Sequence, residues 1–396
     1  MSGQRVTAGV DARTLDLLGA TALLEALVGA TGGSDDIAEI ERVNDLVTAE
    51  WEAIGFRVHR HPIPGRAALL IAELRVGADA PDAERVAVTI VGHSDTVWPV
   101  ETVGDWAFAE DAASGMLSGP GIGDMKAGLV IAGLTARLIA EHASKPGLLR
   151  ILLIPDEEVG SVGSLPIIEQ VAASTDLCIG LEAGKPGDGF VAFRGAVGAM
   201  RIQLQGVPVH VTEPGGVNAV SALLPLAAEV AALSSPEVLV SVCRIRAGEA
   251  RQITAADAWF EVDLRADRAT DLRAAVDRIR GLAADVDPAV AVEVHGGMTR
   301  PELADERSAR PLAMLAALDE VREPSRASAI GIRERGGSDA SFFAAAGVDT
   351  LDGFGAICWD NCARGERVLA SSLPDRAVRM AELAIAWIDR GMRRAR

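Results

Sequence analysis

Three short apolar runs in the first half of the chain each end at residues of the kinds that bind metals. The runs cover residues 86–91, 150–154 and 177–181, and their length and apolar content are typical of buried strands. The residues that follow these runs are His93 and Asp95, then Glu157 and Glu158, and then Glu182. Helical patterns lie between the runs, clearly at 125–142 and weakly at 163–173. This alternation predicts a mainly parallel α/β sheet, in which ligands gather at the carboxyl ends of the strands.

Length and composition narrow the class of protein. The 396 residues suffice for two or three domains, and 49% hydrophobic with 24% charged residues is ordinary globular usage. The net charge of -18 argues against nucleic acid and against a membrane surface as partners. No apolar run approaches the ~18–20 residues that cross a bilayer, and the start of the chain carries no signal-peptide pattern, so we expect a cytoplasmic protein. The four scattered cysteines predict reduced thiols rather than a disulfide scaffold.

The pattern changes near Gly195, where we expect a second and smaller α+β unit. Its expected elements are strands at 198–205, 258–264 and 290–294 and helices at 217–233 and 271–284. Pro301 and the charged stretch after it mark a return to the first domain. A helix at 374–390 closes the chain.

The spacing of the candidate ligands suggests that they act together. His93 and Asp95 are separated by one residue, which in an extended segment places both side chains on the same side. Asp124 lies in the glycine-rich segment GPGIGDMKAG, where backbone amides can hold a carboxylate. Glu157 and Glu158 are adjacent, so that one can bind a metal while the other acts as general base. A surface turn and a solvated acidic pair are the ordinary interpretations, but the joint placement favours a site for zinc, manganese or cobalt.

Six motifs of the chain occur in the order of a known family. The motifs GHSDTVWP, GPGIGDMKAG, PDEEVGS, LEAG, GVPVHVTEPGGVNAV and GGSDASFF together resemble the dinuclear zinc metallopeptidases that include glutamate carboxypeptidase, aminoacylase, acetylornithine deacetylase and succinyl-diaminopimelate desuccinylase. The resemblance covers about residues 23–387. It implies a zinc-peptidase-like mixed sheet flanked by helices, built from residues 1–196 and 303–396. Residues 197–302 would form an inserted α+β lid/dimerisation domain, through which two chains would make a homodimer.

The resemblance also implies the metal ligands. His93, Asp124 and Glu182 would bind one metal, and Asp124 would bridge to a second metal held by Glu158 and a late histidine. The family often has a cis peptide after the bridging aspartate, which here would join Asp124 to Met125.

Catalytic and substrate-binding roles follow from the same resemblance. Asp95 would orient His93, and Glu157 would be the general base that takes a proton from water and passes it to the leaving nitrogen. His210, in GVPVHVTEPGG, would reach across the dimer to stabilise the oxyanion, a contribution worth ~3–4 kcal/mol. Arg265 would grip a substrate carboxylate, for which a planar guanidinium is suited.

Further residues match or depart from the family at the substrate cleft. Gly337 and Ser338 match a loop that lines the cleft and supports the substrate. Gln252 stands where the family has asparagine, which indicates that the substrate contacts have been rebuilt.

The chain departs from the family at the last motif. The family's histidine stands four residues before a glutamate, and in GFGAICWDNCARGERV that place, counted back from Glu366, is Cys362. No histidine follows His295, so a small shift of the alignment does not restore the ligand. A thiolate can bind zinc and complete a mixed dinuclear site. The alternatives are a single metal at the first three ligands, a special catalytic role of the thiol, or a small buried residue without a role.

These features predict a metal-dependent hydrolase that cleaves the amide C–N bond of a small carboxylate-bearing substrate, such as an N-acyl amino acid or a short peptide. We expect one or two divalent metals per chain, zinc before manganese or cobalt. The alternatives are a mononuclear enzyme for a non-peptide amide or an aromatic amine, and a catalytically silent binding protein. Glu157 argues against the silent protein, since binding alone does not require a general base.

Overall fold

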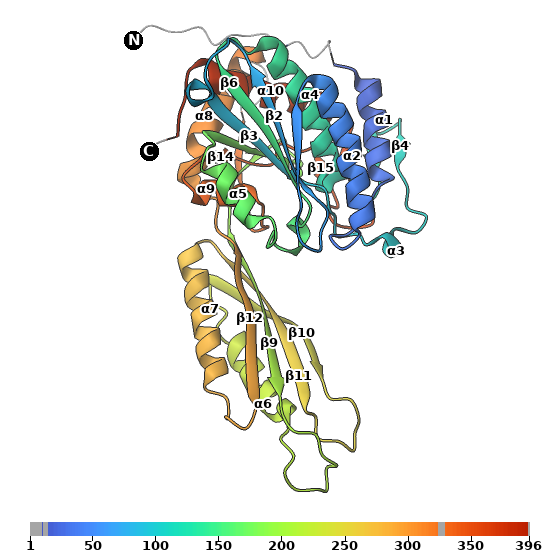
Figure 1. The fold of residues 1–396 in the computed structure, drawn as a ribbon, viewed down its shortest axis with the longest axis vertical. Coiled ribbons are helices and arrows are strands. Elements are labelled where there is room, and N and C mark those ends of the chain that lie inside the picture. Colours follow the sequence, from blue (N-terminus) through green and yellow to red (C-terminus); the bar gives the residue numbers. More distant parts are fainter. Residues whose placement is uncertain (1–9, 11–14, 324–328, 395–396) are drawn as a thin grey trace. The chain divides into compact units, whose positions relative to one another are not determined.

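The computed structural model describes residues 10, 15–323 and 329–394, which form two compact units (Figure 1). The first unit comprises Met1–Phe193, Leu303–Arg333 and Ser338–Arg396, and the second comprises Arg194–Glu302 and Glu334–Gly337. Within the described ranges, no helix combines the length and the apolar character that crossing a membrane requires.

The first unit is built on a six-stranded mixed sheet with the order β1-β2-β6-β3-β7-β14. Its strands are β1 (Arg57–His61), β2 (Leu69–Val76), β3 (Val86–His93), β6 (Gly147–Ile154), β7 (Leu177–Gly180) and β14 (Asp349–Leu351). The pairings of β3 with β6 and β7, and of β7 with β14, are parallel. Those of β1 with β2 and of β2 with β6 are antiparallel. The three apolar runs of the sequence are therefore adjacent strands at the centre of the sheet.

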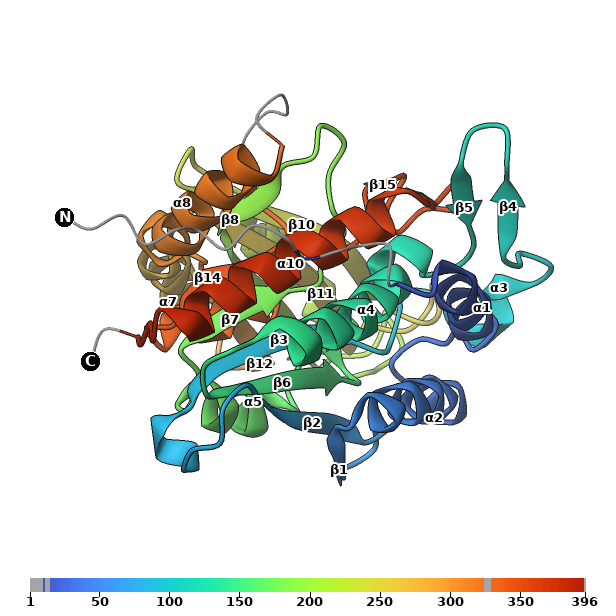
Figure 2. The same cartoon turned by 90° about the horizontal axis from the view of Figure 1, so that it is seen from above.

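Helices cover both faces of this sheet, as the alternation of side chains along β3 shows. Val88 and Ile90 belong to the larger core on one face, whereas Val91 belongs to a smaller core on the other. The helices of the larger core are α1 (Leu17–Val28), α2 (Ile37–Ile54), α4 (Ala127–His142), α8 (Asp305–Arg322) and α10 (Ser372–Asp389). Those of the smaller core are α5 (Leu165–Ala172) and α9 (Ala340–Ala345). Figure 2 shows α4 and α10 side by side over the sheet.

Smaller elements hold the loops at the edge of the first unit. A four-stranded antiparallel sheet contains β4 (Ala109–Asp111), β5 (Met116–Ser118), β15 (Cys358–Trp359) and β16 (Arg367–Leu369). The loop between β15 and β16 carries Cys362 and is anchored because β16 pairs with β5. The short helix α3 (Val100–Val103) precedes β4, and β8 (Phe190–Arg194) pairs with β13 (Gly331–Glu334).

The second unit is an antiparallel sheet with two helices on one face. Its strands, in the order β10-β11-β9-β12, are β10 (Val238–Ala247), β11 (Asp257–Ala266), β9 (Ala196–Gln205) and β12 (Ala291–Arg300). The helices α6 (Ala219–Ala231) and α7 (Ala269–Ala284) bury its apolar core. Asn218 caps α6, where its side chain accepts a hydrogen bond from the Val220 amide at 2.9 Å.

The expected elements are present, and their differences from expectation have local causes. The sheet is mixed, as the family resemblance implies, because β1 and β2 add an antiparallel edge to the parallel strands that the sequence alternation predicts. The helix expected from residue 125 starts at Ala127, because Ile122–Lys126 form a wide turn in which Asp124 is not helical (φ -122, ψ 88). The strand expected at 290–294 continues to Arg300 through two glycines that interrupt the apolar alternation.

Candidate metal centre

The candidate ligands lie at the carboxyl ends of three adjacent parallel strands. His93 is the last residue of β3, and Glu158 belongs to a short turn after β6. Glu182 follows β7 by two residues, and Asp124 lies in the wide turn before α4. Because β6, β3 and β7 are parallel neighbours, their ends meet at one edge of the sheet, and these side chains converge there.

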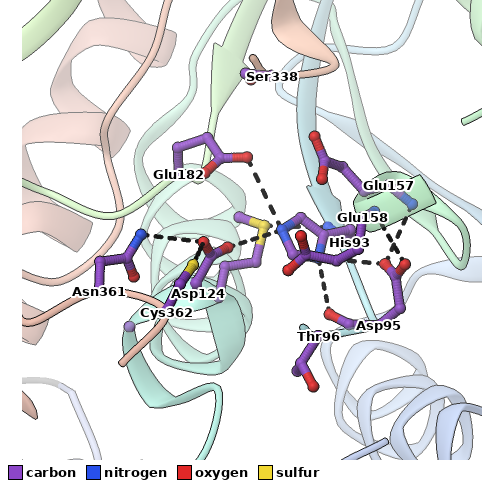
Figure 3. Close-up of polar contacts among 12 residues, drawn as sticks. His93, Asp95, Thr96, Asp124, Glu157, Glu158, Glu182, Ser338, Asn361 and Cys362 are labelled. Carbon is purple, nitrogen blue, oxygen red and sulfur yellow. Dashed lines mark hydrogen bonds and ion pairs between the residues drawn. The ribbon is translucent and has the colours of Figure 1, made fainter. Parts of the chain in front are cut away.

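Three of the side chains form a compact group of donors. One ligand atom each of His93, Asp124 and Glu158 lies within 4.8 Å of the others, and no other such group of histidine, cysteine or acidic side chains occurs among the described residues. His93 Nε2 is 2.9 Å from Asp124 Oδ1 and 3.9 Å from Glu182 Oε1 (Figure 3). The structure thus brings together the four ligands expected from separate motifs, with Glu182 at the margin of the group.

Asp95 joins the histidine to the turn that carries Glu157 and Glu158. Its main-chain carbonyl lies 2.9 Å from His93 Nδ1, and its carboxylate oxygen Oδ1 lies 3.3 Å from the same atom. The carboxylate accepts hydrogen bonds from the amides of Glu157 at 3.2 Å and Glu158 at 3.1 Å. It also accepts one from Ser34 Oγ at 2.6 Å. Asp95 is fully buried. It contacts both the side chain of the proposed ligand His93 and the backbone of the proposed base Glu157.

The turn around Asp124 is held by a distant glutamate. Glu366 Oε1 accepts hydrogen bonds from the amides of Gly123 at 2.6 Å and Asp124 at 2.9 Å. Gly123 is required there, because a Cβ at this position would lie 2.2 Å from Cys358 Sγ. The Asp124–Met125 peptide is cis, as the family resemblance implied.

Cys362 stands beside Asp124, on the side opposite to His93 (Figure 3). Its thiol donates a hydrogen bond to Asp124 Oδ2 at 3.1 Å, and Asn361 Nδ2 donates to the same oxygen at 3.1 Å. Burial and the neighbouring Asp124 carboxylate raise the pKa of the Cys362 thiol. Cys358 is buried further back, and burial raises the pKa of its thiol to about 12.

The electrostatics of the group fit a divalent cation. Burial raises the pKa of Glu158 to about 9, an increase that the charge of His93 opposes and the charges of Asp124, Glu157 and Asp95 reinforce. Glu158 Oε1 is buried without a hydrogen-bond partner. Although burial opposes it, hydrogen bonding to Asp124 and Asp95 raises the pKa of His93 well above its usual value. A buried acidic cluster with an orphaned oxygen and one imidazole is a donor set suited to zinc, manganese or cobalt.

Several residues around the site carried no recognisable signal in the sequence. Asn361 binds Asp124 and Ser34 binds Asp95, both from distant loops. Glu366 was used in the sequence only as the reference position for Cys362, and its contact with the turn at Gly123 was not expected. Lys126 is buried behind the turn, where its Nζ donates to Leu27 O at 2.9 Å and to Thr31 Oγ1 at 2.6 Å. Burial lowers the pKa of Lys126 to about 7.

The remaining expected residues lie outside the cluster, most of them in the second unit. His210 is exposed in a loop, where its Nδ1 lies 2.7 Å from Thr212 Oγ1. Gln252 is also exposed, and its carbonyl accepts a hydrogen bond from the Val211 amide at 2.9 Å.

Arg265, the expected carboxylate anchor, already holds a carboxylate in this structure. Its Nε and Nη2 donate to the two oxygens of Asp263, both at 2.8 Å. The spacing of two residues on β11 places both side chains on one face of the sheet.

Gly337 and Ser338 fall in different units. A Cβ at Gly337 would lie 2.8 Å from Arg300 Cδ, so the close approach of this arginine requires glycine. Ser338 belongs to the first unit, is buried, and accepts a hydrogen bond from the Ala340 amide at 3.2 Å. In Figure 3 its side chain lies apart from the donor group.

A mixed α/β sheet with an inserted α+β unit, and an imidazole with carboxylates at the strand ends, define the class of metal-dependent hydrolases. The chain belongs to peptidase family M20/M25/M40, whose model it matches over residues 89–386. It is 25% identical to carboxypeptidase G2 from Pseudomonas sp. (strain RS-16), over 91% of this chain and 87% of that protein.

Solved structures share the fold. A tripeptidase from Staphylococcus aureus has a TM-score of 0.72 at 17% identity, covering 95% of this chain and 99% of that one. A dinuclear metal-binding peptidase from Bacillus subtilis has a TM-score of 0.63 at 16% identity, covering 94% and 99%. The family resemblance of the motifs, the fold class and the assignment as a metal-dependent hydrolase of amide bonds are confirmed.

Proposed function

We propose that the chain cleaves the amide C–N bond of a small carboxylate-bearing substrate, such as an N-acyl amino acid or a short peptide. The observation that supports this most is the convergence of His93, Asp124 and Glu158 at the strand ends, beside the turn that carries Glu157. The similarity to a protein named as a carboxypeptidase supports a substrate with a free carboxylate.

The proposed ligands of one or two divalent cations, zinc before manganese or cobalt, are His93, Asp124, Glu158, Glu182 and Cys362. A cation bound by these residues polarises the substrate carbonyl and makes water a stronger acid. The buried orphan oxygen of Glu158 and the 2.9 Å contact between His93 and Asp124 support this assignment.

Glu157 is the proposed general base. Its carboxylate takes a proton from the attacking water and delivers it to the leaving nitrogen, a role that contributes typically ~100–10,000-fold to the rate. Asp95 is proposed to position it, because the Asp95 carboxylate holds the amides of both Glu157 and Glu158.

The second unit is proposed to be the lid/dimerisation domain that complements this machinery. His210, from the partner of a homodimer, donates a hydrogen bond to the oxyanion. Arg265 releases the carboxylate of Asp263 and binds the substrate carboxylate in its place, so that one bidentate pair replaces another. Gln252, Gly337 and Ser338 contact the substrate.

A substrate panel with a matched pair of variants tests the proposal. The chain is loaded with zinc, manganese or cobalt and assayed against N-acyl amino acids, dipeptides and arylamides. We expect turnover of at least one carboxylate-bearing amide and a loss of at least about 100-fold in kcat for E157Q with its bound metal unchanged. E141Q, an exposed change at the end of α4, is the control. A chain that binds no cation and hydrolyses nothing contradicts the proposal, and binding without hydrolysis favours the silent protein.

A further inference from the structure

Asp124 presents its two carboxylate oxygens to donors of different chemistry. Oδ1 lies 2.9 Å from the imidazole Nε2 of His93, whereas Oδ2 lies 3.1 Å from the sulfur of Cys362. Figure 3 shows the imidazole and the thiol on opposite sides of the carboxylate. A carboxylate with a separate donor on each oxygen is able to bridge two cations.

The orientation of Asp124 is set by contacts that involve neither donor. Glu366 binds the amides of Gly123 and Asp124, and Asn361 donates to Oδ2 from the loop that also carries Cys362. These contacts fix the backbone on both sides of the Asp124 carboxylate, and its two oxygens therefore face different partners. The thiol of Cys362 therefore lies next to the group of His93, Asp124 and Glu158, which contains the Glu158 oxygen that has no hydrogen-bond partner.

The two sides of Asp124 differ in the cations they favour. Imidazole and carboxylate bind most divalent first-row metals, including manganese and zinc. A thiolate favours soft or borderline cations such as zinc and its heavier analogue cadmium, and disfavours manganese. A site with one imidazole side and one thiol side is thus expected to distinguish between cations that an all-imidazole pair would bind alike.

Building on the metal-dependent function proposed above, in which Asp124 is shared by two cations, we propose that Cys362 makes the two sides of Asp124 differ in the cations that they select. The side formed with Cys362 takes a thiophilic divalent cation of the zinc class, and the side formed with His93 takes zinc or manganese. When the thiophilic cation binds, the S–H bond of Cys362 breaks, the proton goes to solvent, and the sulfur electron pair binds the cation without any change of oxidation state. Manganese alone fills one site per chain, and zinc or cadmium fills two.

Cadmium is the probe that tests this, because a cadmium–thiolate bond absorbs in the ultraviolet whether or not the enzyme turns over. Bound equivalents are counted by native mass spectrometry on the full chain, alongside the absorption titration. We expect the wild type to bind two cadmium ions with a thiolate band and one manganese ion. C362S is expected to lose the band and to lose at least about tenfold in affinity for one cadmium ion. C243S, which removes an exposed thiol on β10, is expected to match the wild type.

Two further variants keep the outcome decisive. C362H places an imidazole at this position. We expect it to lose the absorption band, to keep two cadmium ions and to bind two manganese ions. It replaces C362S as the test if C362S does not fold. C358S reports on the buried neighbouring thiol and is expected to retain the band. Two manganese ions in the wild type, or a band that survives in C362S, overturns the proposal while leaving the hydrolase function intact. A wild type that binds no cation of any kind overturns both.

Discussion

Asp95 offers a quantitative test of how the site is held together. Its Oδ2 accepts two hydrogen bonds, from Glu158 N at 3.1 Å and Ser34 Oγ at 2.6 Å, and its Oδ1 accepts one from Glu157 N at 3.2 Å. In D95N the amide oxygen can keep the first two, but the NH2 group then faces the Glu157 N–H. Losing one bond to a charged group costs about 1.5–3 kcal/mol, and weakening the other two from charged to neutral adds about 1 kcal/mol each. The free energy of unfolding should fall by about 3.5–5 kcal/mol.

Activity should fall for a separate reason, because displacing the turn moves Glu157. A misplacement of about 1 Å can cost about 100-fold, so we expect at least that loss in kcat for the zinc-loaded D95N protein. S34A is the matched control, since it removes one of the three bonds without touching the turn. It should lose about 1.5–3 kcal/mol of stability and keep its kcat.

Urea unfolding, monitored by tryptophan fluorescence, measures the free energy of unfolding. Trp259 is the one tryptophan of six that lies in the second unit, so the signal reports mainly on the unit that contains Asp95. If D95N is no less stable than S34A and retains its kcat, Asp95 does not position the turn, and the reasoning is refuted.

Three other changes probe the first unit. Glu382, buried on α10 and 3.8 Å from Arg322 Nε, has its pKa raised by burial from 4.5 to about 7. Because the folded-state pKa lies above the unfolded one, the carboxylate lowers stability as pH rises from 4.5 to 7. In urea unfolding, the free energy of unfolding of E382Q should therefore exceed that of the wild type by up to about 3 kcal/mol at pH 8 and equal it at pH 4. An E382Q protein that is less stable than the wild type at pH 8 contradicts this. G123A should lose about 1–3 kcal/mol, because its Cβ would lie 2.2 Å from Cys358 Sγ, and adding C358A should recover part of the loss in the same measurement. R364A removes a hydrogen bond to Thr102 O and a guanidinium 5.9 Å from the Trp106 ring, so its melting temperature should drop by a few degrees, with R364K intermediate.

The central strands were predictable because burial on both faces leaves a strong pattern. The runs at 86–91, 150–154 and 177–181 consist largely of valine, isoleucine and leucine, and they coincide with central strands except for Leu181, which follows β7. The family resemblance implied a mixed sheet, but the hydrophobic pattern did not locate its antiparallel edge, since β1 reads Arg-Val-His-Arg-His and has no buried face. Strand ends shifted where glycines interrupt the alternation, as they do in β12.

The site was predictable to the extent that its residues follow strands directly. His93, Glu158 and Glu182 needed only the strand that precedes each of them. Apart from His93, the partners of Asp124 are residues 237 and more positions away, and no local pattern reports a contact of that range. The pairing of Arg265 with Asp263 is different, because the alternation along one strand already placed the two side chains together.

The bonding of Asp95 links the two proposed roles of the site, metal binding and proton transfer. Its carbonyl and carboxylate oxygens contact the imidazole of His93, the proposed metal ligand, and its carboxylate holds the turn that carries Glu157, the proposed base. A descendant of this chain that gave up hydrolysis but kept the metal-binding residues undisturbed would change at Glu157 itself, because a change at Asp95 alters the contacts of His93 as well as those of the turn.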